Sequence, residues 1–169
     1  MNIMRLIYHE ISKSKKFLGF VILLLVILNL NCKNSNYGYP PDTYNQVTIE
    51  QGIWGNVWFW EGDFQPVGFG KITPVVRTVY VYELTPLDSG VIGSRPFYSQ
   101  ILTQLIASTQ SNSTGFYQVT LPEGEYSIFV KEDSLYYANP SDGQFINPVE
   151  VVRDSVSKVQ IDIIYKAYF

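Results

Sequence analysis

Short stretches in which apolar and polar residues alternate recur from about residue 50 to the end of the chain, separated by turn-forming residues. A period of two places successive side chains on opposite faces of a strand, so these stretches predict β-strands. About seven such strands, punctuated by Gly, Pro, Asn and Asp, predict an antiparallel β-sandwich over residues 51–169. The clearest strands are expected at residues 52–60, 75–84, 116–121, 125–131, 146–152 and 156–169.

The same alternation predicts which side chains face the core. On the first strand it turns Ile53, Val57 and Phe59 inward, and on the second it turns Val79 and Val81 inward. Residues 98–110 fit one face of a helix as well as a strand. We expect a short helical or irregular turn there, leading into a strand.

The opposite face of the first two strands is aromatic. Large rigid aromatic surfaces stack on sugar rings or anchor protein partners, so this face is a candidate ligand surface. Alternatively, loops at 61–75 and 85–100 are long enough to cover it and to make a second small core. The side chains concerned are Trp54, Trp58, Trp60, Tyr80 and Tyr82.

Residues 1–31 differ from the rest of the chain. A basic stretch that ends at Lys16 precedes a 14-residue apolar run at 17–30, and Asn31-Cys32 follows at once. A membrane-spanning helix usually needs about 20 apolar residues, so this run fits the core of a signal peptide. Polar residues, Gly and Pro then dominate up to residue 50, which predicts a flexible tether over 32–50.

A basic region, a short apolar core and then a cysteine resemble a bacterial lipoprotein signal. In that class the signal is removed before the cysteine, which receives acyl chains such as palmitate; here that residue is Cys32. The usual leucine three positions before the cysteine is absent, and Asn31 stands where a small residue is usual. The resemblance implies attachment to the cell envelope, and Lys33 implies the outer membrane, on its periplasmic or surface face. The alternative is an uncleaved N-terminal anchor with an incidental cysteine.

Two sequence segments carry a second resemblance. Ser-Asn-Ser-Thr-Gly-Phe-Tyr at 111–117 and Leu-Pro-Glu-Gly-Glu-Tyr-Ser at 121–127 are similar to the signature of carboxypeptidase regulatory-like domains. This resemblance covers about residues 50–169. It implies a seven-stranded transthyretin-like (prealbumin-like) β-sandwich with a structural or recognition role. Asn112 replaces the usual Asp of the signature, and Asn supports the same kind of turn.

Charge and composition exclude several function classes. Residues 1–31 hold four basic and one acidic residue, and the remainder holds eight basic and fourteen acidic residues, a net of −6. Such a balance argues against nucleic-acid binding, which needs a basic footprint. The single histidine, His9, and the single cysteine, Cys32, both precede the body. The body therefore lacks the residues for a histidine-based triad, a His/Cys metal cluster or a disulfide.

The remaining candidate chemistry is modest. Glu61 with Asp63, and Glu132-Asp133 with Asp142, read as solvated charges near strand ends rather than as acid–base or calcium sites. Asp133-Ser134-Leu135 and Asp154-Ser155-Val156 resemble a bacterial O-glycosylation acceptor of the form Asp-Ser/Thr-apolar.

These observations predict a lipid-anchored envelope protein that is not an enzyme and has a structural or recognition role. It would use no cofactor or metal ion, and its partners would be the membrane and an envelope protein or a glycan. The alternative is a carbohydrate-binding accessory lipoprotein that uses the aromatic face.

Overall fold

Strand β1 (Gly52–Asp63) is the centre of the first of two sheets in the computed structural model, which describes residues 38, 40, 41 and 43–169. The first half of β1 pairs with β7 (Phe116–Thr120) and β11 (Val156–Lys158). Its second half pairs with β2 (Lys71–Pro74) and β12 (Ile161–Tyr168). Strands β11 and β12 run parallel to β1, whereas β2 and β7 run antiparallel to it.

The second sheet has seven strands and is antiparallel throughout. Its long central strand β8 pairs with β3 on one edge and with β9 and β10 in succession on the other. Its members are β3 (Thr78–Glu83), β4 (Val91–Ser94), β5 (Phe97–Ile101), β6 (Leu105–Gln110), β8 (Gly124–Glu132), β9 (Leu135–Tyr137) and β10 (Pro148–Val151).

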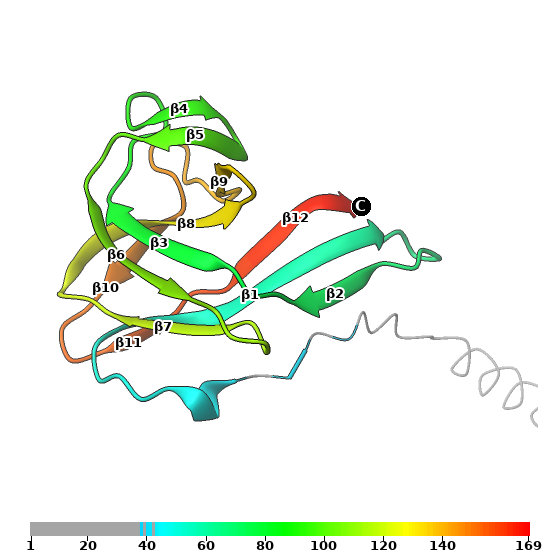
Figure 1. Cartoon of the computed structure of the whole chain (residues 1–169), viewed down its shortest axis with the longest axis horizontal. Helices are drawn as coiled ribbons and strands as arrows, with labels where there is room; N and C mark the ends of the chain where they lie inside the picture. The colour runs from blue at the N-terminus through cyan, green and yellow to red at the C-terminus, as the bar shows by residue number, and fades with distance from the viewer. Residues whose placement is uncertain (1–37, 39, 42) are drawn as a thin grey trace, which may run out of the picture. The chain divides into compact units, whose positions relative to one another are not determined.

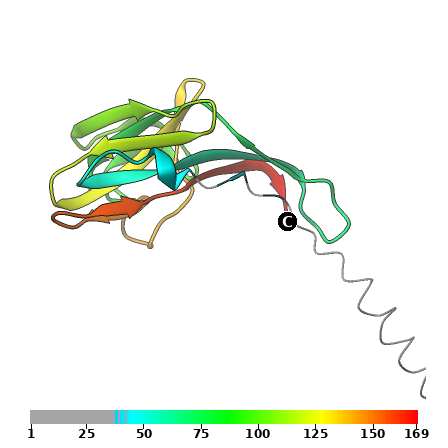
Figure 2. The same cartoon turned by 90° about the horizontal axis from the view of Figure 1, so that it is seen from below.

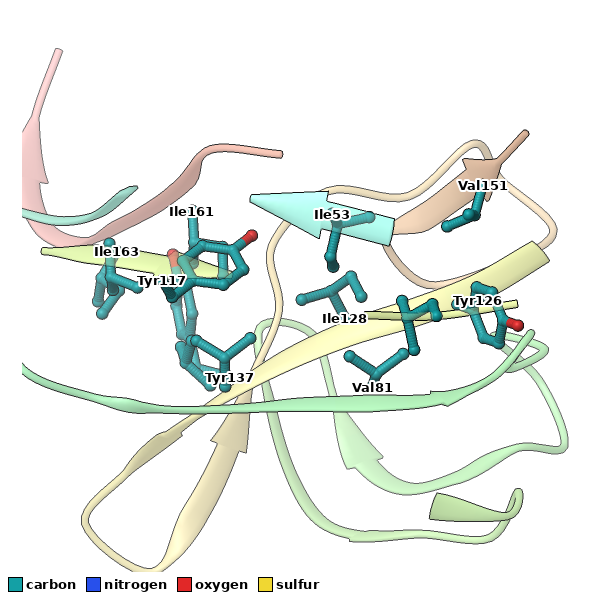
Figure 3. Close-up of a cluster of buried hydrophobic side chains, with 13 residues drawn as sticks. Ile53, Val81, Tyr117, Tyr126, Ile128, Tyr137, Val151, Ile161 and Ile163 are labelled. Atoms are coloured by element: carbon teal, nitrogen blue, oxygen red, sulfur yellow. The ribbon is translucent and has the colours of Figure 1, made fainter. Parts of the chain in front are cut away.

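The main core lies between the two sheets, as Figure 3 shows. Ile53 and Val57 of β1 meet Val81 of β3 and Ile128 of β8, and all four side chains are inaccessible to solvent. Burial of each such side chain contributes about 1.5–3 kcal/mol, so this layer supplies much of the stability. The alternation therefore predicted the inward faces of these strands correctly.

A second core lies on the other face of the seven-stranded sheet. Phe129 and Tyr82 point away from the main core and pack with Tyr98 and Ile101, which come from β5. The β4–β5 hairpin folds back over this face and pairs with β9. The segment at 85–100 thus covers the sheet, as one of the two sequence alternatives expected, whereas the segment at 61–75, which that alternative also expected to cover the aromatic face, includes β2 and pairs with the edge of β1.

The all-β sandwich is confirmed, but its strands differ from those predicted. The described residues form twelve strands rather than about seven, and the helical turn expected within 98–110 is wrong, because β5 and β6 occupy this stretch. Strands β2 and β4 arise in predicted loops, where pairing with a neighbouring strand overrides weak local patterning.

The expectation of a purely antiparallel sandwich is also wrong for β11 and β12. Parallel neighbours need a long crossover connection. Here all seven strands of the second sheet lie between β1 and β11 along the chain, so they supply this long connection.

An arm extends from the two-layer body. Figures 1 and 2 show the far ends of β1, β2 and β12 running beyond the second sheet as a three-stranded ribbon. We define the arm as residues 60–72 and 164–169. A loop at 64–70 joins β1 to β2 at its far end.

Residues 43–50 contact the first sheet. The prediction of a flexible tether over 32–50 is therefore wrong for this part of the segment. Thr43 is buried and donates from Oγ1 to Asn56 Oδ1 at 2.9 Å. The Thr48 backbone N–H donates to Gln118 Oε1 at 2.9 Å, and the Gln118 amide donates to Thr48 Oγ1 at 2.7 Å. Local composition missed this because polar side chains hold the segment in place.

The predicted signal peptide and Cys32 lie outside the described residues. Within the part of the chain that the structure describes, no helix has the length and apolar character needed to cross a bilayer.

Candidate functional site

The predicted aromatic ligand face does not form an exposed surface. Trp54, Trp58 and Tyr82 are buried, with Trp58 only 6% exposed, and Trp60 and Tyr80 are partly buried. Both faces of these strands carry packed layers, which the period of two cannot reveal. The prediction of an exposed stripe is therefore corrected to one of structural aromatic residues.

Residues 43–50 lie against Trp54 on the outer face of the first sheet. The ring of Tyr44 lies 5.4 Å from that of Trp54, and Phe116 lies 6.4 Å away on the neighbouring strand. The Lys158 ammonium group stands 5.0 Å from the Trp54 ring, a favourable cation–π distance. The indole of Trp54 is thus a packing centre for the N-terminal segment.

The structure separates the predicted face, because β1 and β3 belong to different sheets: three tyrosines on β3 and β9 form a compact cluster on the outer face of the seven-stranded sheet, away from the tryptophans of β1. Tyr82 donates its hydroxyl to the Tyr136 hydroxyl at 3.1 Å, and Tyr80 packs edge-on against Tyr136 at 5.3 Å. Burial raises the pKa of Tyr82, and its neighbour Tyr136 raises it further. The Lys131 ammonium group lies 3.9 Å above the Tyr136 ring. These contacts leave little aromatic surface for a ligand to reach.

Among the residues described, the apolar side chains most exposed to solvent lie at the end of the arm. Phe69 is 95% exposed and Val67 is 86% exposed, the highest values among large apolar side chains of the described residues. Tyr168 and Phe169, beside the same loop, are also exposed. We call these four residues the arm tip. Exposed apolar groups that gather in this way mark interaction surfaces.

Rings and backbone hydrogen bonds shape the loop behind the arm tip. Phe64 stacks on Phe169 with ring centroids 5.6 Å apart, and its backbone N–H donates to the Tyr168 carbonyl at 2.8 Å. A side chain at Gly70 would collide with the Phe64 ring, so glycine is required for this approach. The loop therefore holds Val67 and Phe69 on a structured turn.

The charged groups of the arm lie on its strands and balance one another, and Asp63 reaches the edge of the arm tip beside Tyr168. Glu61 is the direct register neighbour of Lys71 on β2 and of Lys166 on β12. Residues 64–70 carry no charged side chain. The arm thus has an uncharged loop at its end and charges of both signs on its strands. The lack of charged residues at 64–70 is the sequence signal that could have indicated an interaction surface there.

A small cleft lies beside the arm, with a volume of about 290 Å³. Asp162 is its polar centre: Oδ1 accepts the Trp60 indole N–H at 2.9 Å, and both carboxylate oxygens accept from the Gln160 amide. Pro140 and Phe169 provide apolar walls. We call this site the arm cleft; it combines a carboxylate, an amide and aromatic rings.

The predicted acidic positions separate into different environments. Glu61 and Asp63 are exposed, as expected of solvated charges near a strand end. Asp142 accepts the backbone N–H groups of Gln144 and Phe145 at 2.8 and 2.6 Å, and these bonds lower the pKa of its carboxyl. Among the residues described, no three His, Cys, Asp or Glu side chains are grouped to hold a metal ion.

Glu132 is not the solvated charge that the sequence predicts, because the fold buries it in a hydrogen-bonded ion pair. It is buried, pairs with the Arg77 guanidinium group and accepts the Tyr165 hydroxyl at 3.0 Å. Burial, and then this hydrogen bond, raise the pKa of Tyr165 to about 12, so the hydroxyl stays protonated and able to donate at neutral pH.

The two candidate glycosylation serines both follow an aspartate with positive φ. Ser134 is exposed in the tight turn from β8 to β9, after Asp133 at φ 51°. Ser155 is partly buried ahead of β11, after Asp154 at φ 53°. The serines lie at separate turns of the fold, and whether either is modified stays a prediction.

The turn at 111–115 has the form that its sequence predicts. Asn112 Oδ1 accepts the backbone N–H groups of Thr114 and Phe116 at 2.9 and 3.1 Å. Gly115 follows at φ 77°, a conformation that glycine adopts at little cost. Asn112 therefore supports this turn as an aspartate would.

Comparison of the chain with known protein families, curated proteins and solved structures finds no match. The resemblances to lipoprotein signals and to carboxypeptidase regulatory-like domains thus stay predictions from the sequence.

Proposed function

We propose that this chain is a lipid-anchored protein of the cell envelope, most simply of the outer membrane, without enzymatic activity. In this proposal acyl chains on Cys32 hold a transthyretin-like, carboxypeptidase regulatory-like sandwich at the bilayer. The sandwich has a structural or recognition role, and its arm makes the contacts.

One observation carries the proposal: the most exposed large apolar side chains of the described residues, Phe69 and Val67, stand on a structured loop at the end of a projecting arm. Each such side chain would gain about 1.5–3 kcal/mol of free energy if it were buried, and this gain is not realised within the chain. A contact surface accounts for their placement, whereas packing within the chain does not.

The position of Cys32 is compatible with anchoring. Among the described residues, the first buried side chain hydrogen-bonded to the sandwich is that of Thr43, eleven residues further on. Acylation at Cys32 would therefore leave the described contacts intact. Each buried CH₂ of an acyl chain contributes about 0.8 kcal/mol, and several chains together hold a domain at a membrane.

Replacement of Cys32 by alanine is expected to abolish acylation. Cells that express the wild-type chain and are fed a clickable fatty acid should yield a labelled protein, and Cys32→Ala should yield none. Ser35→Ala is the matched control and should be labelled like wild type. Label that persists in Cys32→Ala would refute this anchor. A mature chain that keeps residues 1–31 would favour the uncleaved alternative.

The arm cleft supports a second candidate function, a carbohydrate-binding accessory lipoprotein. Sugars offer hydroxyl donors to a carboxylate and C–H faces to aromatic rings, and Asp162 lies among such rings. This site replaces the buried aromatic face as the place where a glycan would bind.

A glycan array probed with the purified protein tests this candidate. If a glycan binds at the arm cleft, Asp162→Asn should weaken binding about tenfold or more, because a hydrogen bond to a charged group is worth about 1.5–3 kcal/mol. Glu61→Gln is the control, since Glu61 is an exposed carboxylate on the arm that does not line the cleft. Binding that Asp162→Asn leaves unchanged, or an array without binding, counts against a sugar site here.

A further inference from the structure

We propose that the arm tip enters the lipid bilayer to which the chain is attached, so that the protein contacts its membrane at two points. This inference rests on the proposed lipid anchor and names the partner of the arm. The arm tip consists of Val67, Phe69, Tyr168 and Phe169, as defined above.

The chemistry of the arm tip suits a membrane interface. Its loop, Phe-Gln-Pro-Val-Gly-Phe-Gly at 64–70, contains no charged residue, and its two outermost side chains are apolar. Tyr168 adds an amphipathic ring, a type of side chain that collects where hydrocarbon meets headgroups. The buttressed loop needs no refolding to present these groups.

The electrostatics of the arm do not oppose approach to a bilayer. Charged groups would be costly in hydrocarbon. The nearest to the loop is the exposed Asp63, which accepts the Gln65 backbone N–H at Oδ1 and pairs in register with Tyr168, so it would stay at headgroup level while Val67 and Phe69 insert. Glu61 is flanked across both ladders by Lys71 and Lys166, so the base of the arm is close to neutral. It would lie at headgroup level, where charges remain solvated.

The length of the chain allows both contacts at once. Thr43 is bonded to Asn56 on β1, and Asp63 at the far end of that strand is seven residues away. A strand rises about 3.3 Å per residue, so Asp63 lies roughly 23 Å from Asn56, and the arm tip lies a little further out. The eleven residues from Cys32 to Thr43 span at most about 36–40 Å when extended. The acylated cysteine and the arm tip can therefore reach one bilayer surface.

The size of the arm tip favours lipid over a protein partner. A stable protein–protein interface uses about 20–30 residues on each side. The arm tip offers four side chains on a narrow projection, and its apolar character is not continued along the charged base. A bilayer requires only that a few apolar groups pass the headgroups.

Depth-dependent fluorescence of the full-length acylated chain tests this proposal. The purified protein is reconstituted into vesicles of phosphatidylethanolamine with a minority of phosphatidylglycerol. An environment-sensitive thiol probe is placed at Val67→Cys on the arm tip, and at Thr120→Cys as the control. Thr120 is exposed and pairs with Gly52, at the opposite end of β1 from the arm.

A probe at position 67 should emit at shorter wavelength than the one at position 120 and should lose most of its intensity when nitroxide-labelled lipids are added. Adding Phe69→Ser to Val67→Cys should reduce both effects, because it removes a neighbouring apolar group. Both substitutions are at highly exposed positions, so the sandwich should fold normally.

Two results would overturn the proposal. The probe at position 67 could behave like that at position 120, which would place the arm tip in water. It could also shift to the blue only at high protein density and escape quenching by nitroxide lipids, which would indicate a second copy of the chain. Mass spectrometry of the same preparation counts reactive thiols, so a free Cys32 would reveal failure of the proposed anchor separately.

Discussion

Gly55→Ala is expected to lower the free energy of unfolding by about 3 kcal/mol, at the upper end of the usual cost of overpacking. A Cβ atom at position 55 would overlap the backbone carbonyl of Val159 and would stand 3.3 Å from the Tyr117 ring. Two hydrogen bonds hold the Val159 backbone in place, so it cannot shift away without losing them. Its N–H donates to the Trp54 carbonyl at 2.7 Å, and its carbonyl accepts the Tyr117 hydroxyl at 2.6 Å.

Urea unfolding followed by tryptophan fluorescence measures this loss, because Trp54 and Trp58 flank the site and are buried. Gly38→Ala is the matched control, since a Cβ atom there would meet no other atom within 4 Å. A Gly55→Ala midpoint equal to that of Gly38→Ala would show that the crossing of Val159 over β1 is looser than the structure has it.

Arg77→Ala is expected to cost about 3 kcal/mol, because it leaves the buried Glu132 carboxylate without its cation. Arg77 lies just ahead of β3, Glu132 ends β8, and the hydrogen bond from Tyr165 joins this pair to β12 of the other sheet. The loss comes mainly from an uncompensated buried charge, so removing that charge as well should reverse most of it.

Thermal unfolding of three variants separates this explanation from loss of packing alone. The double variant Arg77→Met, Glu132→Gln should recover most of the stability lost in Arg77→Ala. Arg153→Ala, which breaks the exposed Arg153–Glu123 pair, should leave the transition close to that of wild type. If Arg77→Ala unfolds like Arg153→Ala, the ion pair contributes nothing to joining the sheets.

The sequence allowed prediction of the sandwich and of its inward-facing residues, because burial on one face leaves a strong alternation in strands such as the one that holds Val79 and Val81. It also allowed prediction of the Asn112 turn, where the chemistry is local. It did not show that Trp54 and Tyr82 would be covered, because covering segments are chosen by long-range packing.

The arm was missed for a related reason. Strand β2 has only four residues and follows a loop rich in glycine, so its own pattern is weak, and it forms because β1 offers it a ladder. The docking of Thr43 likewise depends on Asn56, a partner thirteen residues further along the chain. Local composition describes a segment well only when its neighbours along the chain are also its neighbours in space.

The parallel pairing of β1 with β12 also determines the order in which the two sheets can fold. The nascent chain emerges amino end first, so the pairing of Trp58 on β1 with Asp162 on β12 cannot form until β12 has been synthesised. Closing a loop of roughly a hundred residues is entropically costly, and topologies rich in such distant pairings fold slowly. The native first sheet therefore cannot be complete until β12 has left the ribosome, whereas every strand of the second sheet precedes β11 along the chain and can pair earlier.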